Sequence, residues 1–358
     1  MNHLSSVEID QFGKELDELR DEVVADRGAR DAAYIRRVIA WQRGLEVGGR
    51  GLLFLSFLPP AWVAGTAALT TAKILENMEI GHNVMHGQWD WMRDPKIHSS
   101  SWEWDNVSPA EQWKHSHNFV HHTFTNVIGM DRDVGYAILR MSPEQEWKPF
   151  HLAQPFYNML LAPLFEWGVA LHDLEVEKLS SGEKTWAEAR PQLRKILRKA
   201  GRQAAKDYVA FPLLAGPNFL PVLLGNLTAN VLRNVWAHTV IFCGHFPEDI
   251  EVFGEERLED ETKGEWYVRQ LRGSGNITGG RAMHLMSGNL SHQIEHHLFP
   301  DLPSNRYAEI APRVRELCEK YGLPYNTGSL VKQTATVWKK VFRLALPGPR
   351  RSTAESTS

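Results

Sequence analysis

Histidines gather in three short segments of this sequence, and each segment contains two histidines four residues apart. The segments HNVMH, HNFVHH and HQIEHH contain His82 and His86, then His117, His121 and His122, and then His292, His296 and His297. On a helix this spacing places two imidazoles on one face, about one turn apart, where both can bind the same metal ion. Histidines of an ordinary core or surface would be scattered. The pattern therefore predicts a multinuclear metal site with nitrogen ligands.

The composition excludes several other kinds of site. The chain has 358 residues and a net charge of -3, which gives no indication of nucleic-acid binding. Its two cysteines, Cys243 and Cys318, cannot form a disulfide framework and lie in no CxxC motif. Zinc or iron–sulfur sites with thiolate ligands are therefore not expected. The N-terminal segment is charged and lacks the apolar core of a signal peptide, so we interpret it as amphipathic helix.

Apolar residues are concentrated in two regions, although the mean hydropathy of -0.35 is that of a soluble protein. One region follows Arg50 and contains Pro59-Pro60, and the other covers residues 208–246 with a turn at Gly216 to Pro221. A membrane-spanning helix needs about 20 apolar residues. We predict an all-α integral membrane fold with about four transmembrane helices in two hairpins. The first arm is short unless its helix begins before Arg50, and a soluble protein with buried helices is the alternative.

Charges next to these hairpins predict their orientation. The two turns carry no Lys or Arg, whereas the flanking segments are rich in both, as in KILRKAGRQAAK at 195–206. By the positive-inside tendency, both termini and a helical cap with all the histidine clusters then face the cytoplasm. Residues 155–171 predict an interfacial amphipathic helix. We expect three parts: N-terminal cytoplasmic helices at 1–43, a membrane domain at 44–315, and a C-terminal segment at 316–358 with a disordered tail.

A fourth polar pair lies within the second apolar region. Asn234 and His238 are again four residues apart, in NVWAH. Polar side chains are costly at membrane depth unless they have a function. The shared spacing favours His238 as a further metal ligand.

These motifs together resemble the membrane fatty-acid desaturases, a di-iron family defined by three histidine boxes. The resemblance rests on GHNVMHG, HNFVHHTFTN and HQIEHHLFP and extends from the first hairpin to about residue 315. The runs HTFTNVIGMDRDVGY and QIEHHLFPDLPSNRY are most similar to bacterial acyl-CoA or acyl-lipid desaturases, including actinobacterial stearoyl-type and front-end enzymes. Asn234–His238 resembles a further ligand element of stearoyl-CoA desaturases, in which the Asn holds a metal-bound water.

The resemblance implies a ligand set with one open position. It implies iron ligation by the seven histidines that match the boxes: His82, His86, His117, His121, His122, His296 and His297. In the third box the family pattern points to Gln293, whereas the four-residue spacing nominates His292. A neutral imidazole is a better iron ligand than an amide, so His292 stays a candidate ligand, with Gln293 as a weak ligand or a partner of one.

Acidic residues beside the boxes are candidates to orient the imidazoles, because a ligating imidazole usually donates its other N–H to a carboxylate or carbonyl. Surface or capping roles are the alternative for each of them. The candidates are Glu79, Asp131, Asp133, Glu295 and Asp301.

Removing hydrogens from an unactivated methylene requires a cofactor. The expected cofactor is a pair of iron ions, with O2 as co-substrate and no other bound cofactor. The expected reaction inserts a cis double bond into a long-chain acyl-CoA or acyl-lipid, in a bacterial cell membrane. The chain has neither the HPGG motif of a fused cytochrome b5 nor a dinucleotide-binding GxGxxG after a strand. A ferredoxin, or a flavin or iron–sulfur reductase using NAD(P)H, would then supply electrons.

Two other functions share part of this pattern. A histidine-box hydroxylase would use the same oxidant but place oxygen on carbon, and incorporation of labelled oxygen would distinguish it. A membrane electron carrier with bis-histidine haem would need only two histidines per haem. The HH doublets in two boxes would then be unexplained, and a Soret band would decide.

Overall fold

Helices make up most of the structure, a computed structural model that describes residues 4–348. The predicted tail lies outside the described residues from 349 onward. The longer helices are α1 (Ser6–Asp26), α2 (Ala29–Phe54), α3 (Pro59–Leu75), α7 (Gln154–Leu161), α8 (Phe165–Asp173), α10 (Trp186–Ala204), α12 (Phe219–His245), α13 (Lys263–Arg272), α16 (Tyr307–Tyr321) and α17 (Leu330–Ala345). Strands β1 (Asn276–Thr278) and β2 (Thr327–Ser329) form a two-stranded parallel sheet. The predicted helical fold class is confirmed, with this small sheet as an addition.

Shorter elements connect the long helices. The short α-helices are α4 (Asn83–Met85), α5 (Ala110–Trp113), α6 (His122–Phe124), α9 (Val176–Ser181), α11 (Phe211–Leu214), α14 (Arg281–Met286) and α15 (Gln293–Leu298). Three π-helical segments are η1 (Glu76–His82), η3 (Lys114–His121) and η6 (Ala205–Ala210). The 3-10 segments are η2 (Asp90–Met92), η4 (Val134–Ala137), η5 (Pro149–Ala153), η7 (Gly216–Asn218), η8 (Glu255–Leu258), η9 (Leu290–His292) and η10 (Ser304–Arg306).

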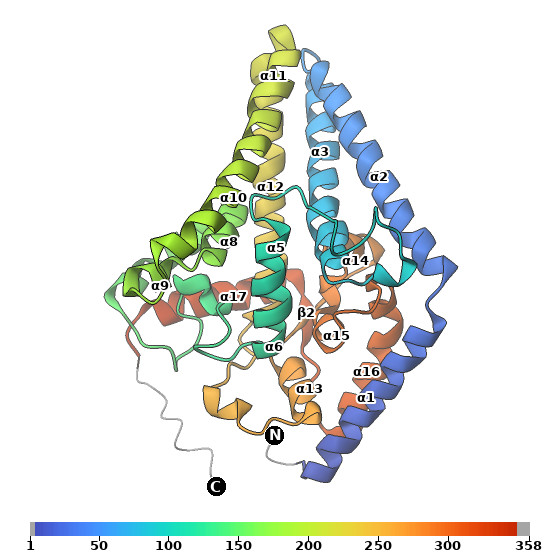
Figure 1. The fold of residues 1–358 in the computed structure, drawn as a ribbon, viewed down its shortest axis with the longest axis vertical. Coiled ribbons are helices and arrows are strands. Elements are labelled where there is room, and N and C mark those ends of the chain that lie inside the picture. The colour runs from blue at the N-terminus through green and yellow to red at the C-terminus, as the bar shows by residue number, and fades with distance from the viewer. Residues whose placement is uncertain (1–3, 349–358) are drawn as a thin grey trace.

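The two predicted hairpins are present and rise together from a helical body (Figure 1). Helix α2 continues through the glycines before Arg50, and α3 starts at Pro59, a residue suited to the first turn of a helix. Gly49 and Gly65 face each other across this hairpin. A Cβ on Gly65 would lie 2.9 Å from the carbonyl oxygen of Gly49. The two glycines therefore allow the backbones of α2 and α3 to approach closely.

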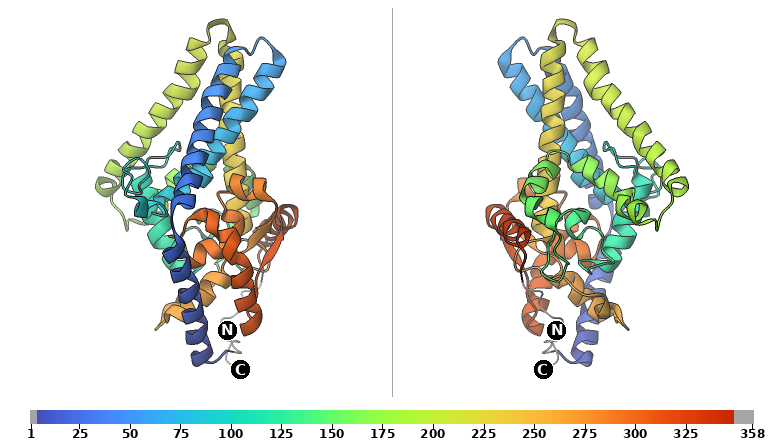
Figure 2. Two further views of the ribbon diagram at one scale, coloured as in Figure 1. Left: turned by 90° about the vertical axis from the view of Figure 1, so that its right-hand side faces the viewer. Right: turned by 90° about the vertical axis from the view of Figure 1, so that its left-hand side faces the viewer.

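The second hairpin joins α11 to α12 through η7. Gly216 has a φ of +57°, a backbone conformation that glycine adopts without steric cost. Helices α10, η6 and α11 follow one another along a single rising path, and α12 returns to the body beside α3 (Figures 1 and 2). The return helix ends at His245, among the histidines of the body.

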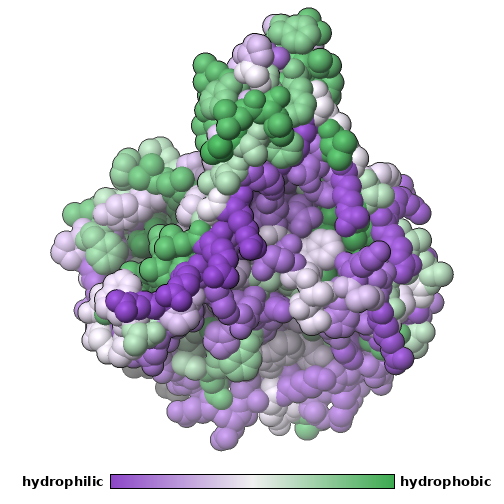
Figure 3. Space-filling view, turned by 45° about the horizontal axis from the view of Figure 1, so that its top comes forward, coloured by the Kyte–Doolittle hydropathy of each residue, from purple (hydrophilic) through white to green (hydrophobic). Residues whose placement is uncertain are grey.

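Apolar side chains lie exposed at the tip formed by both hairpins. Figure 3 shows this tip as the most hydrophobic part of the face in view. Its exposed side chains include Phe57, Leu58, Leu213, Leu214 and Leu220.

A second group of exposed apolar side chains lies on α7 and α8, within the segment predicted as interfacial. This group is Phe156, Met159, Leu160, Leu164, Trp167 and Leu171.

In residues 4–348, no helix combines the length and the apolarity needed to cross a bilayer.

Ion pairs tie the hairpins to the body. The carboxylate of Asp207 is buried and lies 3.0 Å from the Arg50 guanidinium and 2.8 Å from the Lys73 ammonium. Lys73 also pairs with Asp105 at 2.9 Å. Buried charges need such partners, because an unpaired one is strongly destabilising. This network fixes α2, α3 and η6 relative to one another.

Candidate metal centre

The first box lies where α3 changes into a π-helix. The segment η1 extends α3 without a break and ends at His82, and His86 follows directly after the short helix α4. Their ring centroids are 4.7 Å apart. A π-helical turn is wider than an α-helical one and is frequent at functional sites. The predicted pairing of the two imidazoles on one face is therefore present, although the helix is not a regular α-helix there.

The second box also lies in a π-helix. The segment η3 and the following α6 carry His117, His121 and His122. His117 packs against His82, with ring centroids 5.1 Å apart, whereas His122 stacks on His297 at 4.4 Å. Box two thus faces both of the other boxes.

The third box approaches the first through a glycine. Gly288 has a φ of +70°, and a Cβ there would lie 2.4 Å from the carbonyl oxygen of Met78. Only glycine fits this approach. The carbonyl of Gly288 accepts a hydrogen bond of 3.1 Å from Asn83. Helix α15 follows this turn and carries His296 and His297, both fully buried.

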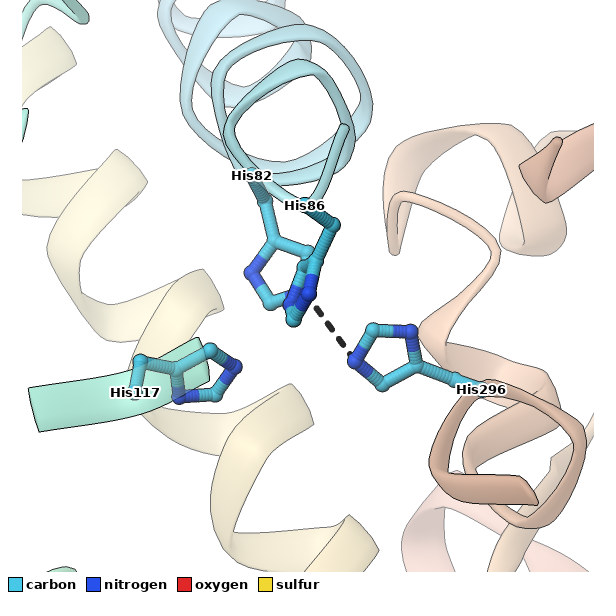
Figure 4. Close-up of side chains that lie close together, drawn as sticks. All are labelled: His82, His86, His117 and His296. Carbon is cyan, nitrogen blue, oxygen red and sulfur yellow. Dashed lines mark hydrogen bonds between the residues drawn. The ribbon is translucent and has the colours of Figure 1, made fainter. Parts of the chain in front are cut away.

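These segments form two adjoining clusters of imidazoles. One cluster consists of His82, His86, His117 and His296. Each of these rings offers one nitrogen, and the four nitrogens lie within 4.8 Å of one another. Figure 4 shows these four rings converging from three segments of the chain. The other cluster contains His121, His245 and His297, and His122 groups with His296 and His297. Through their grouping with His122, His296 of the first cluster and His297 of the second therefore link the two clusters.

The distances between ring nitrogens suit shared metal ions. The Nε2 atoms of His82 and His296 are 3.3 Å apart, and those of His245 and His297 are 3.2 Å apart. Two nitrogens bound to one ion at about 2.1 Å are separated by about 3.0–3.4 Å. Several buried ring nitrogens have no hydrogen-bond partner within residues 4–348, including Nε2 of His86, His117 and His121 and both nitrogens of His122. An ion would satisfy nitrogens that are otherwise costly to bury.

The cluster holds its imidazoles neutral, with one exception. Burial, followed by the proximity of other imidazoles, lowers the pKa of His82, His122 and His296 well below its usual value. For His121, burial disfavours the charged ring, but the charge and hydrogen bond of Asp131 outweigh it and raise the pKa to about 9. Neutral imidazole is the metal-binding form of histidine, so this donor set fits metal ions.

His245 is a member of the cluster that the sequence did not nominate. It lies at the end of α12, seven residues beyond His238, and its ring is buried. The predicted candidate Gln293 lies beside it, with 2.9 Å between the amide nitrogen and the His245 Nε2. Gln293 thus lies against the cluster.

His238 lies apart from the two clusters, whereas Asn234 lines a cavity to which His82, His117, His121 and His245 also contribute. The His238 Nε2 is 2.9 Å from the Asn158 side-chain oxygen, and its ring stacks on Phe242. The Asn234 amide donates to the Pro163 carbonyl at 2.9 Å. Although these residues share the expected spacing, no grouping of possible ligands within residues 4–348 includes His238.

His292 is also separated from the clusters. It ends the short 3-10 segment η9 and has non-helical backbone angles of φ -104° and ψ 57°. Because the helix starts only at Gln293, His292 and His296 do not share a helical face. The ring of His292 instead stacks on His284, with centroids 4.6 Å apart.

Two of the acidic candidates lie beside clustered imidazoles, and the others bond to residues outside the clusters. Asp131 lies 3.0 Å from His121 Nδ1, and Asp133 lies 3.7 Å from both His117 and His121. Glu295 instead accepts hydrogen bonds from Asn276 and Tyr325, which fixes α15 against β1.

The remaining two acidic candidates also bond to residues outside the clusters. Glu79 accepts from Tyr34, Asn289 and Ser304, and Asp301 pairs with Arg20.

Two polar residues orient the third-box rings, and the motif pattern did not indicate either. The Gln270 oxygen lies 3.0 Å from His297 Nδ1, while its amide donates to the His122 carbonyl at 3.0 Å. The Tyr307 hydroxyl lies 3.4 Å from His296 Nδ1 and donates to the Phe299 carbonyl. Such partners fix the orientation of a ligating ring and the nitrogen it offers to the metal. Helix α13 thus holds boxes two and three together.

A cavity adjoins both clusters. His82, His117, His121 and His245 contribute to its lining. Apolar side chains contribute another part of the lining, namely Met78, Tyr136, Phe165, Val169, Ile241 and Phe246. Polar side chains contribute a comparable part, including Asn77, Asp133, Glu166, Asp173 and Asn234.

A family model described as fatty acid desaturase matches residues 58–329, most of the chain and all three boxes. The chain belongs to the fatty acid desaturase family. The predicted family and enzyme class, an oxidoreductase of lipid metabolism, are therefore confirmed.

Relatives within this desaturase family include bacterial and animal enzymes. The chain is 53% identical over 349 residues to an NADPH-dependent stearoyl-CoA 9-desaturase of Mycobacterium tuberculosis, covering 96% of this chain and 82% of that protein. It is 26% identical over 287 residues to an sn-1 linoleoyl-lipid 6-desaturase of Synechocystis, covering 77% of this chain and 78% of that protein. Human fatty acid desaturase 3 is 26% identical over 298 residues, covering 76% of this chain and 60% of that protein. Front-end-like relatives are thus present as expected.

Proposed function

We propose that this desaturase uses two iron ions and O2 to insert a cis double bond into a long-chain acyl-CoA. The observation that carries the proposal is the pair of adjoining imidazole clusters, which His122, His296 and His297 link. Neutral nitrogen donors suit iron. His82, His86 and His117 would hold one ion together with His296, and His121, His122, His245 and His297 would surround the other.

The reaction is balanced when R–CH2–CH2–R′, O2, two electrons and two protons give R–CH=CH–R′ and two waters. The iron pair, when bound, would activate O2 and provide the oxidant that an unactivated C–H bond requires. The residues of the chain position this chemistry. Asp131, Gln270 and Tyr307 hold their rings through Nδ1. The apolar side chains of the cavity, such as Phe165 and Ile241, would pack against an acyl chain beside the clusters.

The proposed partners of this chain are a CoA thioester and an NADPH-linked source of electrons. The 53% identical relative is named for stearoyl-CoA and NADPH, which supports a CoA thioester over an acyl-lipid and an NADPH-linked source of electrons. We expect the electrons to arrive through a separate ferredoxin or flavin or iron–sulfur reductase, since the sequence contains no dinucleotide-binding fingerprint.

The proposed location of the two hairpins is a membrane. The exposed apolar tip and the apolar side chains of α7 and α8 support insertion of the hairpins into a bacterial cell membrane. The clusters would then lie on the cytoplasmic side, below the tip. Fractionation of cells that express the chain tests this location directly.

Expression with a competent NADPH-linked reductase, followed by mass spectrometry of cellular fatty acids, tests the reaction. The expected product is a monounsaturated acyl chain without added oxygen, and label from 18O2 should appear only in water. Label in the lipid would indicate a hydroxylase instead. His121→Ala should abolish product and lower the iron content. His115→Ala is the matched control, because its exposed ring lies on the same helix η3 and stacks on Phe119, away from the clustered histidines.

A further inference from the structure

Helix α10 carries a row of four arginines on its outer face. Arg190, Arg194, Arg198 and Arg202 follow one another at intervals of four residues, and all four are exposed. At 1.5 Å per residue the row is about 18 Å long. Within residues 4–348, none of the four forms an ion pair or hydrogen bond with another side chain. The row is therefore a strip of positive charge without a counterpart in this part of the chain.

The lysines of the same region behave differently. Lys195 pairs with Glu111 at 2.5 Å, and Lys206 pairs with Asp105 at 2.8 Å. Lys199 pairs with Glu103. The protein thus supplies an acid to each of these lysines and to none of the arginines. Like charges four residues apart on a helix repel each other and weaken it, so this arrangement indicates an external anion.

The position of the row indicates which anion. Helix α10 continues through η6 into α11, where Leu213 and Leu214 are 63% and 75% exposed. Figure 3 shows a hydrophilic band that descends from the hydrophobic tip toward the side on which α10 lies in Figure 1. Leu197 and Trp186 on α10 are also exposed, at 60% and 62%. The strip therefore begins at the base of the tip and has apolar side chains beside it.

We infer that the arginine row of α10 binds the phosphates of an anionic lipid surface. Arginine presents a planar fork of N–H donors that matches phosphate oxygens. An extended strip fits the repeated phosphates of a lipid surface better than it fits one small anion, and basic segments next to a membrane are attracted to anionic lipid. The inference rests on the proposed membrane location, and not on the metal site or the reaction.

The test counts lipids bound to the detergent-solubilised full chain by native mass spectrometry. Dioleoyl phosphatidylglycerol is the anionic probe, and dioleoyl phosphatidylcholine is the neutral one. The unchanged chain should retain phosphatidylglycerol preferentially, and high salt should weaken this retention. R190Q/R194Q/R198Q/R202Q should lose roughly tenfold or more in apparent affinity. Equal retention by the variant and the unchanged chain would overturn the inference.

A matched control removes four positive charges from helices other than α10. Arg30, Lys263, Arg313 and Lys320 are exposed basic residues on α2, α13 and α16, and their replacement by Gln should leave phosphatidylglycerol retention unchanged. Glutamine preserves helix propensity, and thermal unfolding checks that each variant is folded. Arg198→Gln alone, with an expected loss of severalfold, replaces the quadruple variant if that variant does not fold.

Competition identifies the source of the phosphate. CoA or inorganic phosphate at equal concentration should displace little phosphatidylglycerol, and an acidic ferredoxin should bind the quadruple variant as well as it binds the unchanged chain. Full displacement by CoA would assign the row to the acyl carrier and overturn the lipid assignment, as would loss of ferredoxin binding without loss of lipid. A chain that retains phosphatidylglycerol but makes no double bond would contradict the proposed reaction alone.

Discussion

The Nε2 atoms of His245 and His297 lie 3.2 Å apart, although 52 residues separate the two histidines in the chain. Each ring also packs against His121, at centroid distances of 4.7 and 5.1 Å. The end of α12 therefore contributes to the candidate metal centre as directly as the boxes do.

His245→Ala should remove an iron ligand and lower activity at least about 100-fold. Iron per folded chain, measured by atomic emission, should fall with it. His238→Ala is the control, because that ring contacts Asn158 and Phe242 in place of the cluster. A His245→Ala chain with a full complement of iron would remove this residue from the ligand set.

Gln270→Leu should weaken metal binding by about 10–100-fold, because His297 loses the acceptor at Nδ1 and the His122 carbonyl loses its donor. Gln270→Glu keeps the acceptor for His297 but loses the donor to the His122 carbonyl, so it should recover only part of the affinity. Titration of the metal-free chain with Fe(II) or Co(II), followed optically, measures this without relying on turnover. Unchanged affinity in Gln270→Leu would show that the hydrogen bond does not orient His297.

Gly65→Val should destabilise the first hairpin by about 1–3 kcal/mol, the usual cost of overpacking. Its side chain would meet the Gly49 carbonyl oxygen and the Leu53 nitrogen, both 2.9 Å from an added Cβ. Gly48→Val is the matched control, since nothing lies within 4 Å of an added Cβ there. Thermal unfolding in detergent compares the two, and equal melting temperatures would contradict the close packing of α2 and α3.

Lys340→Met should stabilise the chain at neutral pH. Burial, with a smaller contribution from Arg343, lowers the pKa of Lys340 to about 8. The unfolded chain has the ordinary value of about 10.4, so the cost of burying the charge is fully present below pH 8. That cost disappears as the pH rises from about 8 to 10.4, because there folding releases a proton.

The gain from Lys340→Met should therefore be about 1–2 kcal/mol at pH 7, after the loss of the hydrogen bond to the Pro247 carbonyl, and should shrink above pH 8. Unfolding measured at pH 7 and pH 10 checks this. A gain that is the same at both values would contradict the assigned pKa.

Spacing predicted most of the site because box histidines follow local helical geometry. The seven histidines that match the boxes come together as expected, and Pro59 and Gly216 marked the hairpin turns. Local spacing could not identify His245, because its partners lie on other segments and only the packing of α12 against α15 and η3 brings them together. The pair Asn234–His238 had the expected spacing but precedes His245 on α12, where Asn234 bonds to Pro163 and His238 to Asn158.

The third box shows why the four-residue spacing also nominated His292, which lies outside the two clusters. The four-residue interval from His292 to His296 has its helical meaning only if both residues are in one helix. The backbone at His292 is non-helical and α15 begins at Gln293, so the interval does not bring the rings together. The start of a short helix depends on tertiary contacts, here the turn at Gly288 against Met78, which a single sequence does not display.

The link that His296 and His297 form between the two clusters has a consequence for biogenesis. His82 is the earliest of the clustered histidines, and His296 and His297 are the last to be synthesised. With one iron ion in each cluster, as proposed, neither ion would acquire its complete set of imidazoles until α15 has left the ribosome and docked against η1 and η3. We therefore expect iron insertion to be a late event in maturation, and a chain truncated before α15 to retain neither ion stably.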